Sequence, residues 1–183
     1  MERVPYRATA ASVVYSEMQL PVCILLDNVR SMYNVGAFFR TADGAGVARL
    51  LLSGITPRPP KAGITKTALG AENRVAWEGV DDPIGAVNGL RSQGYEIAAI
   101  ETSLRAVDVF DWQPRFPVFV LFGHEVDGLA PPLLDLCDMH VRIPMLGVKH
   151  SLNVASAGAV VTYELLRKYR SLCTKELAQE RAG

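Results

Sequence analysis

The sequence predicts an α/β domain built on a mostly parallel sheet that is flanked by helices. Apolar runs of strand length alternate with segments of helical pattern along most of the 183 residues. Several of these runs are continuously apolar, which is typical of strands covered on both faces. In sheets of this kind, ligands bind at the carboxyl ends of the strands.

The first part of the chain contains two strands, one helix and one long loop. Residues 21–27, PVCILLD, form a continuous apolar run with polar ends, which predicts a buried strand. The segment AFFRTADGAG after Asn34 predicts a helix that ends at its glycines, and residues 47–54 predict a second strand. Residues 55–66 are rich in Pro and Gly. We expect a loop there, and a loop of this length in a compact domain commonly has a function.

The second part of the chain repeats the alternation and ends in a long helix. We expect helices at residues 82–94 and 130–137, strands at 95–101, 116–123 and 139–144, and a last helix from about Ser151 to about Lys168. The expected organisation is a short N-terminal extension (1–20), one domain (21–170) and a C-terminal tail or frayed helix (171–183).

Composition predicts a single globular, cytoplasmic domain without a metal. The chain is 49% hydrophobic and 21% charged, and its apolar runs are far shorter than the roughly 20 residues of a membrane helix. The first twenty residues lack the pattern of a signal peptide. The three cysteines are scattered, and Cys137 and His140 have ligand-like spacing without a second pair. We therefore predict neither a disulfide framework nor a zinc site.

Charge is balanced overall but uneven along the chain. The formal net charge of zero does not by itself indicate a nucleic-acid partner. Between Arg49 and Arg74, however, five basic residues stand against one acid, Glu72. This segment predicts either a basic stripe on a neutral protein or a merely solvated loop, and composition favours neither.

Polar motifs follow three of the predicted strands. They are Asn34-x-Gly36-x-x-x-Arg40-x-Ala42, Gly123-x-Glu125-x-x-Gly128-Leu129, and Ile143-Pro144-Met145 with Ser151-Leu152-Asn153-Val154-Ala155. Each has an ordinary alternative explanation: Asn34 or Ser151 as a helix N-cap, Arg40 as a surface residue, and the glycines as turn formers. Because the carboxyl ends of parallel strands share one edge of the sheet, the three motifs are expected to converge in space.

In this order and separation, the motifs resemble those of the SpoU (TrmH-like) branch of the SPOUT RNA methyltransferases, over residues 21–168. The resemblance implies a deep trefoil knot in the C-terminal part, which holds S-adenosyl-L-methionine, and a homodimer formed through the last helix and the knot region. Such a dimer would explain the small residues at 155–159, since they permit close approach of a partner or of the threaded chain. Packing within the chain is the alternative.

The resemblance further implies transfer of the sulfonium methyl group to a ribose 2′-hydroxyl of RNA, with tRNA favoured over rRNA. It places the cofactor against the backbone around Gly123, Ile143 and Leu152, with Thr102 as a further wall. Backbone amides in such loops can bind the adenine edge without charged side chains, which suits a cofactor that has no phosphate.

The resemblance also implies a catalytic set centred on Arg40. A guanidinium stays protonated, so we expect it to orient the 2′-oxygen or a phosphate rather than to act as a base. Asn34 and Asn153 are expected to hold Arg40 or the substrate, and Ser151 to donate toward the reacting region. Glu125 is expected to pair with Arg40 or to accept a proton.

Two other functions compete with this one. The chain could be a non-catalytic RNA-binding or assembly module that retains the knotted fold, but such a module would be expected to lose Arg40, Glu125 or Asn153, and all three are present. A methyltransferase that acts on a base is a weaker alternative, because the motif set points to ribose.

Overall fold

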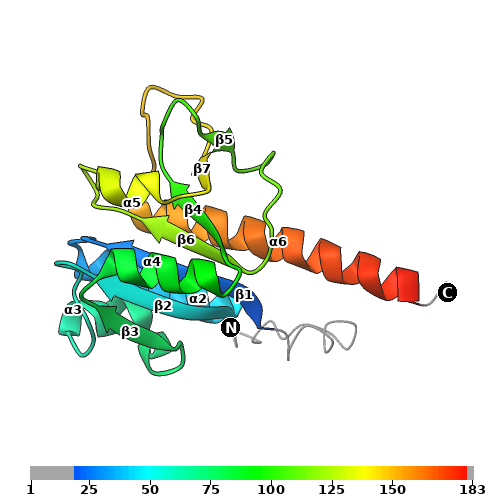
Figure 1. Ribbon diagram of the computed structural model, residues 1–183. Coiled ribbons are helices and arrows are strands. Elements are labelled where there is room, and N and C mark those ends of the chain that lie inside the picture. The colour runs from blue at the N-terminus through cyan, green and yellow to red at the C-terminus, as the bar shows by residue number, and fades with distance from the viewer. Residues whose placement is uncertain (1–18, 181–183) are drawn as a thin grey trace.

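The computed structural model describes residues 19–180 (Figure 1). Residues 1–18 of the expected N-terminal extension therefore lie outside the described part. The elements in chain order are β1 (Leu20–Asp27), α2 (Met32–Ala45), β2 (Val47–Ser53), α3 (Ala62–Ala68), the 3-10 turn η2 (Ala71–Asn73), β3 (Trp77–Val80), α4 (Pro83–Ser92), β4 (Glu96–Ile100), β5 (Val107–Asp108), β6 (Val118–Phe122), α5 (Pro131–Asp135), β7 (Met139–Arg142) and α6 (Val154–Glu180).

The described strands form one seven-stranded sheet in the order β3-β2-β1-β6-β4-β7-β5, and every pairing is parallel. Ile24 of the central strand β1 pairs with Leu50 on one side and Val120 on the other. The strand order reverses between β1 and β6, which makes their carboxyl ends the expected place for a ligand. The predicted α/β class with a parallel sheet is confirmed, whereas the knot stays a prediction.

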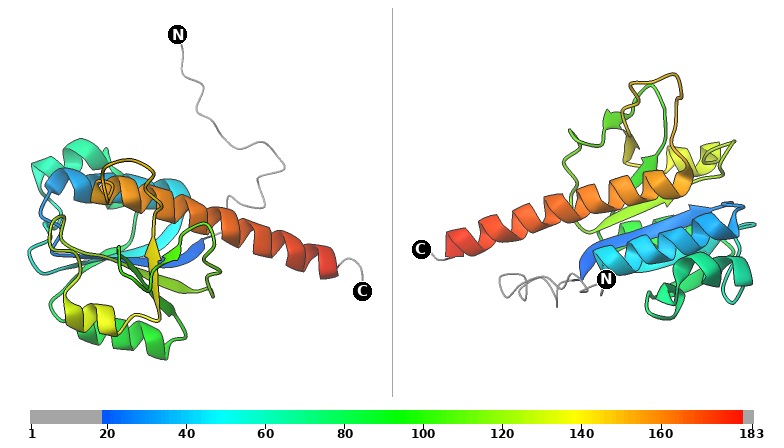
Figure 2. Two further views of the ribbon diagram at one scale, coloured as in Figure 1. Left: turned by 90° about the horizontal axis from the view of Figure 1, so that it is seen from above. Right: turned by 180° about the vertical axis from the view of Figure 1, so that it is seen from behind.

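Helices cover both faces of the sheet, as Figures 1 and 2 show from opposite sides. Alternate side chains of β1 point to opposite faces, so Ile24 and Leu26 pack on the side of α2 and α6. Cys23 and Leu25 pack on the side of α4 and α5. This two-sided burial explains why the strands read as continuous apolar runs. No helix between residues 19 and 180 is long and apolar enough to cross a membrane.

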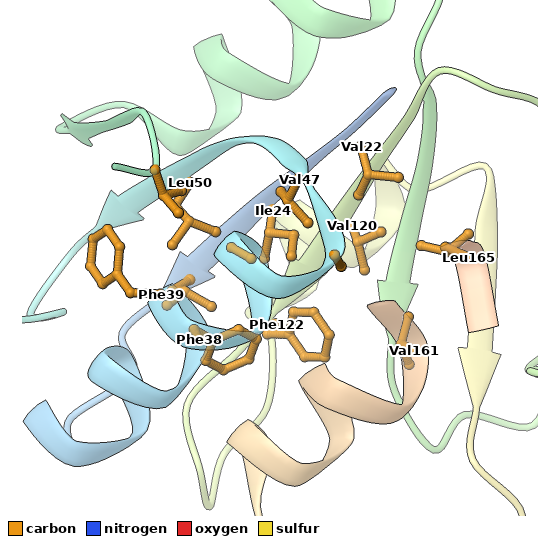
Figure 3. Packing of buried hydrophobic residues seen from close by; sticks show 14 of the residues in the cluster. Val22, Ile24, Phe38, Phe39, Val47, Leu50, Val120, Phe122, Val161 and Leu165 are labelled. Carbon is orange, nitrogen blue, oxygen red and sulfur yellow. The ribbon is translucent and has the colours of Figure 1, made fainter. Parts of the chain in front are cut away.

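Gly158 of α6 packs directly against the buried ring of Phe38. Phe38 of α2 and Phe122 of β6 lie edge to face with ring centroids 5.0 Å apart (Figure 3). A Cβ atom on Gly158 would overlap the Phe38 ring. Glycine in a helix costs about 1 kcal/mol relative to alanine, and here it leaves room for a fully buried phenylalanine. At this position, packing within the chain accounts for the small residue.

Both capping alternatives suggested by the sequence are wrong. Ser31 is the N-cap of α2, and its Oγ accepts a hydrogen bond from the Asn34 N–H at 3.3 Å, so Asn34 lies inside the first turn. At α6, the Asn153 Oδ1 atom accepts from the Ala155 N–H at 3.0 Å, which makes Asn153 the capping residue instead of Ser151. The capping preference of these residue types was sound, but the exact residue depends on the chain path.

Four further expectations about elements need correction. The last helix does not end near Lys168 but continues to Glu180, because no proline or glycine interrupts the chain after Gly158 until Gly183. Part of the expected loop at 55–66 belongs to helix α3. Strands β3 and β5 were not predicted: β3 has the half-exposed edge sequence WEGV, and β5 has only two residues. Such short or polar segments carry too little periodicity to be recognised.

Candidate active site

A cavity opens at the carboxyl ends of β4, β6 and β7, where the loops after these strands meet the start of α6. The residues proposed for the cofactor from the sequence all line it, and so do two of the proposed catalytic residues. They are Thr102, Gly123, Ile143 and Leu152, together with Glu125 and Ser151. The second and third motifs therefore meet at one edge of the sheet.

The loop after β6 is a tight hairpin that starts at Gly123. His124 and Gly128 exchange two backbone hydrogen bonds of 3.1 and 3.0 Å. A Cβ atom on Gly123 would overlap the backbone of Gly128 and Leu129, so only glycine permits this close approach. The hairpin thus forms one wall of the cavity, and at Gly123 and Gly128 that wall consists of backbone alone.

Glu125 extends from this hairpin to the start of α2. Its carboxylate accepts hydrogen bonds from the Arg30 and Ser31 N–H groups at 3.0 and 3.1 Å, and from Asn34 Nδ2 at 3.0 Å. Asn34 in turn accepts a bond of 3.2 Å from Asn153 Nδ2. Glu125, Asn34 and Asn153, one from each motif, therefore form a continuous hydrogen-bonded network beside the cavity.

The surroundings of Glu125 favour its ionised form. Partial burial raises the pKa of the carboxyl group, but the hydrogen bonds from Arg30, Ser31 and Asn34 outweigh burial, and the pKa lies below its ordinary value. A carboxylate that accepts three such bonds is a poor proton acceptor at neutral pH. The structure thus favours a positioning role for Glu125 over the proton-accepting role considered from the sequence.

We expect Glu125→Gln to lower the thermal stability of the protein at about pH 7, because an amide can no longer accept from all three donors. Because the pKa of Glu125 is lower in the folded protein than in the unfolded chain, its carboxylate stabilises the fold at any pH above the ordinary pKa of Glu. This stabilisation is lost as the pH falls through the pKa that Glu125 has in the folded protein. The difference in Tm between wild type and variant should therefore shrink between about pH 7 and about pH 3. Glu78→Gln, which removes a surface ion pair to Arg49, serves as the control. A difference in Tm that does not vary with pH would contradict this explanation.

Arg40 does not reach this network within the chain. Its side chain is exposed, does not line the cavity, and takes part in no hydrogen bond or ion pair of the described residues. Arg40 follows Asn34 by six residues in α2, which places it about 9 Å further along the helix and about 120° around it. The expected contacts of Arg40 with Glu125 and with the two asparagines are therefore not formed in this chain.

Glu101 and Ala157 are among the cavity-lining residues that were not proposed for the site from the sequence. Glu101, at the end of β4, accepts hydrogen bonds from the Thr102 N–H at 2.9 Å and from the Leu129 N–H at 3.4 Å. It thereby links two walls of the cavity, and its only signal in the sequence was an acid at the end of a buried strand. Ala157 of α6 also lines the cavity, so its small side chain leaves space there.

The spacing of Cys137 and His140 does not make a metal site in the described part of the chain, where no group of three or more His, Cys, Asp or Glu side chains comes together. Burial raises the pKa of the Cys137 thiol to about 12, so it stays protonated. The His140 ring instead contacts Ser103 Oγ at 2.8 Å and Arg105 Nη2 at 2.6 Å.

The arrangement of sheet, cavity and motifs agrees with a known family. The model of the SpoU rRNA Methylase family matches residues 21–163, which is more than half of the chain. The chain belongs to this family. The assignment to the SpoU branch, made from the three motifs, is therefore confirmed.

Relatives with assigned activities align with most of this chain. A tRNA (guanosine(18)-2'-O)-methyltransferase of Aquifex aeolicus is 29% identical over 85% of this chain and 73% of its own. A 23S rRNA (guanosine-2'-O-)-methyltransferase of Vibrio parahaemolyticus is 30% identical over 85% of this chain and 62% of its own. The AdoMet-bound rRNA methyltransferase from Sinorhizobium meliloti superposes with a TM-score of 0.76 at 27% identity, over 82% of this chain and 57% of its own. The chain spans about three fifths of the length of several curated relatives.

Proposed function

We propose that this SpoU family protein transfers a methyl group from S-adenosylmethionine to a ribose 2′-hydroxyl of RNA. The observation that carries the proposal is the network of Glu125, Asn34 and Asn153, which joins the three motifs beside one cavity. The two relatives named above are both RNA 2′-O-methyltransferases, and the similar solved structure contains AdoMet.

The chemistry of the cavity fits S-adenosylmethionine. Its walls near Gly123, Ile143 and Leu152 offer backbone polar groups and apolar surface, which suit an adenosine without phosphates. Glu101 and Arg142 also line the cavity and carry opposite charges, as the amino and carboxyl groups of a methionine moiety require. When bound, this cofactor supplies the electrophilic methyl group.

The remaining residues act on the RNA. Ser151 lines the cavity and can donate a hydrogen bond to the reacting ribose. Asn34 donates to Glu125 and accepts from Asn153, so these bonds keep the three loops in register for an in-line attack. We favour tRNA over rRNA as the substrate, as the resemblance of the motifs implies, and a tRNA enzyme is among the relatives compared above.

Arg40 fits this mechanism best in a homodimer. Since Arg40 lies away from the cavity of its own chain, a partner subunit would have to present it to the substrate. The exposed face around Arg40 is shared by α2 and α6, where Gly44 lies against the Tyr163 hydroxyl. Sedimentation should show a dimer at working concentrations. A monomer under the conditions of the reaction would contradict this part of the proposal.

Ala157→Leu tests the cofactor site. The added atoms would enter the cavity lined by Ala157, and we expect the affinity for S-adenosylmethionine to fall about tenfold, the scale of about 1 to 3 kcal/mol for overpacking. Isothermal calorimetry in the presence of a chelator measures this, with Ala62→Leu on the exposed start of α3 as the control. Equal affinity in both variants would contradict the assignment of the cavity, and wild-type binding no tighter than about millimolar would contradict the cofactor.

The cellular experiment is mass-spectrometric mapping of ribose methylation in total tRNA and rRNA from cells with and without the gene. The proposal expects one or more 2′-O-methyl groups to disappear, and restoring the gene to return them. Unchanged methylation with altered RNA processing would instead support the non-catalytic RNA-binding module.

A further inference from the structure

Tyr33 is an exposed aromatic residue next to Asn34 of the hydrogen-bonded network. Tyr33 precedes Asn34 in the first turn of α2, and 53% of its surface is exposed. Lys66 of α3 lies over the ring, with its Nζ 5.9 Å from the centroid, near the outer limit for a cation–π contact. Arg40 follows Tyr33 by seven residues, so helix geometry places it on the same side of α2. We call Tyr33, Arg40 and Lys66 the α2–α3 face.

The α2–α3 face is held rigidly. The Thr67 hydroxyl of α3 donates a hydrogen bond of 3.2 Å to the Tyr33 carbonyl oxygen, which fixes α3 against the first turn of α2. Ile64 of α3 is fully buried in the same core cluster as Phe38 and Phe39 of α2. Tyr33 therefore presents its ring from a packed scaffold, and little conformational freedom is lost when a ligand stacks on it.

Positive charge remains unneutralised on this face. Two arginines of the basic segment are neutralised by ion pairs: Arg49 pairs with Glu78 and Arg58 with Asp81, each at 3.2 Å. Lys66 and Arg40 have no ion pair among the described residues, and no acid occurs in the chain between Asp43 and Glu72. Glu72 is buried and Asp43 is the exposed acid on α2. In the basic segment, Lys61, Lys66 and Arg74 are exposed and have no ion pair among the described residues, and Lys66 is the one on the α2–α3 face.

An exposed aromatic ring with neighbouring cations suits single-stranded RNA. Bases stack on aromatic side chains whatever their sequence, while lysine and arginine contact the phosphates. Because Tyr33 adjoins Asn34, a base stacked on Tyr33 would belong to a nucleotide close to the one that enters the active site. A second copy of this chain is the competing occupant around Tyr33 and Lys66, but the unpaired charge of Lys66 favours a polyanion.

We propose that the α2–α3 face binds the RNA strand next to the target nucleotide, with Tyr33 stacking on a flanking base and Lys66 contacting the backbone. This inference rests on the proposed function, because it assumes that RNA enters the site beside Asn34. It assigns to Tyr33 a role in the affinity for RNA and in the choice of RNA, but none in cofactor binding.

The test measures binding of fluorescently labelled bulk tRNA and bulk rRNA fragments by anisotropy. Tyr33→Ala should weaken binding of the preferred RNA about tenfold, the usual scale for losing one stacked base. Tyr33→Phe keeps the ring and should stay within about twofold of wild type. Lys66→Ala should weaken binding of both RNAs and lower the salt slope by about one. Arg49→Ala, which removes a cation already paired with Glu78, is the matched control.

Three results would overturn the inference: wild-type RNA affinity in Tyr33→Ala, dissociation of a dimer by Tyr33→Ala in sedimentation, or no binding of either RNA by the wild type. The affinity for S-adenosylmethionine should be the same in all variants. Failure of the proposed function is a separate outcome, because a protein that binds RNA through Tyr33 without methylating it would support the face and contradict the enzyme.

Discussion

Arg40→Ala is expected to reduce the rate of RNA methylation about a hundredfold or more while leaving the affinity for S-adenosylmethionine unchanged. The rate should fall because a fixed cation near the reacting oxygen stabilises charge in the transition state, and losing such a group commonly costs this much. Cofactor affinity should persist because Arg40 does not line the cavity. Single-turnover methylation and calorimetry measure the two quantities separately.

Arg40→Lys distinguishes between charge and geometry. Lysine keeps the positive charge but loses the planar fork of donors. Substantial rescue would favour simple charge placement, whereas no rescue would favour bidentate orientation of the 2′-oxygen or a phosphate. Near-normal activity of Arg40→Ala would show that the role assigned to Arg40 from the family motif is wrong.

Mixing Arg40→Ala with Asn153→Ala, which breaks the network beside the cavity and is expected to be inactive as well, tests whether Arg40 acts on the partner's site. When Arg40→Ala and Asn153→Ala proteins are mixed and allowed to exchange subunits, half of the dimers contain one subunit of each kind. If each active site takes Asn153 from one chain and Arg40 from the other, one of the two sites in such a dimer contains both native residues. Activity should then return to about a quarter of wild type. If both residues act within one chain, the mixture should stay inactive.

Phe38→Ala is expected to cause the largest loss of stability, about 3 to 5 kcal/mol, because the side chain is fully buried between α2, β6 and α6. Urea unfolding at fixed protein concentration measures this loss. Phe110→Ala, at a ring that is 55% exposed, is the control and should cost less than about 0.5 kcal/mol.

Gly158→Ala should change the sign of its effect when Phe38 is removed. In the wild type the new methyl group meets the Phe38 ring, and overpacking of about 1 to 3 kcal/mol outweighs the gain in helix propensity. In Phe38→Ala the ring is absent, so the same substitution should stabilise α6 by up to about 1 kcal/mol. Additive effects would show that Gly158 is not there to admit the ring.

The fold was predictable wherever burial left a strong pattern. The central strands β1, β2, β4 and β6 are covered on both faces, and their apolar runs indicated the parallel sheet. Strand β3 and helix α3 lie at an edge, where alternation is weak and prolines mask the helix start. The end of α6 was missed because no local signal marks it before Gly183.

The candidate site was predictable as a set of residues but not as a set of contacts. Parallel topology implied that the three motifs converge, and six of the proposed residues line the cavity. Which partners Glu125 bonds depended on the path of the chain before α2, and the backbone N–H groups of Arg30 and Ser31 leave no trace in a sequence. Arg40 lies away from Glu125 because it follows Asn34, which bonds Glu125, by six residues of helix and therefore points to another side of α2. The motif gives the spacing of the two residues but not their directions.

The most direct measurement incubates the purified protein with S-adenosylmethionine that carries a deuterated methyl group and with unmodified tRNA or rRNA, followed by digestion to nucleosides and mass spectrometry. The proposed function predicts the heavy methyl group on the ribose of one nucleoside, in wild type and not in Arg40→Ala. A heavy methyl group on a base, or none in either RNA while the protein binds the cofactor, would contradict it.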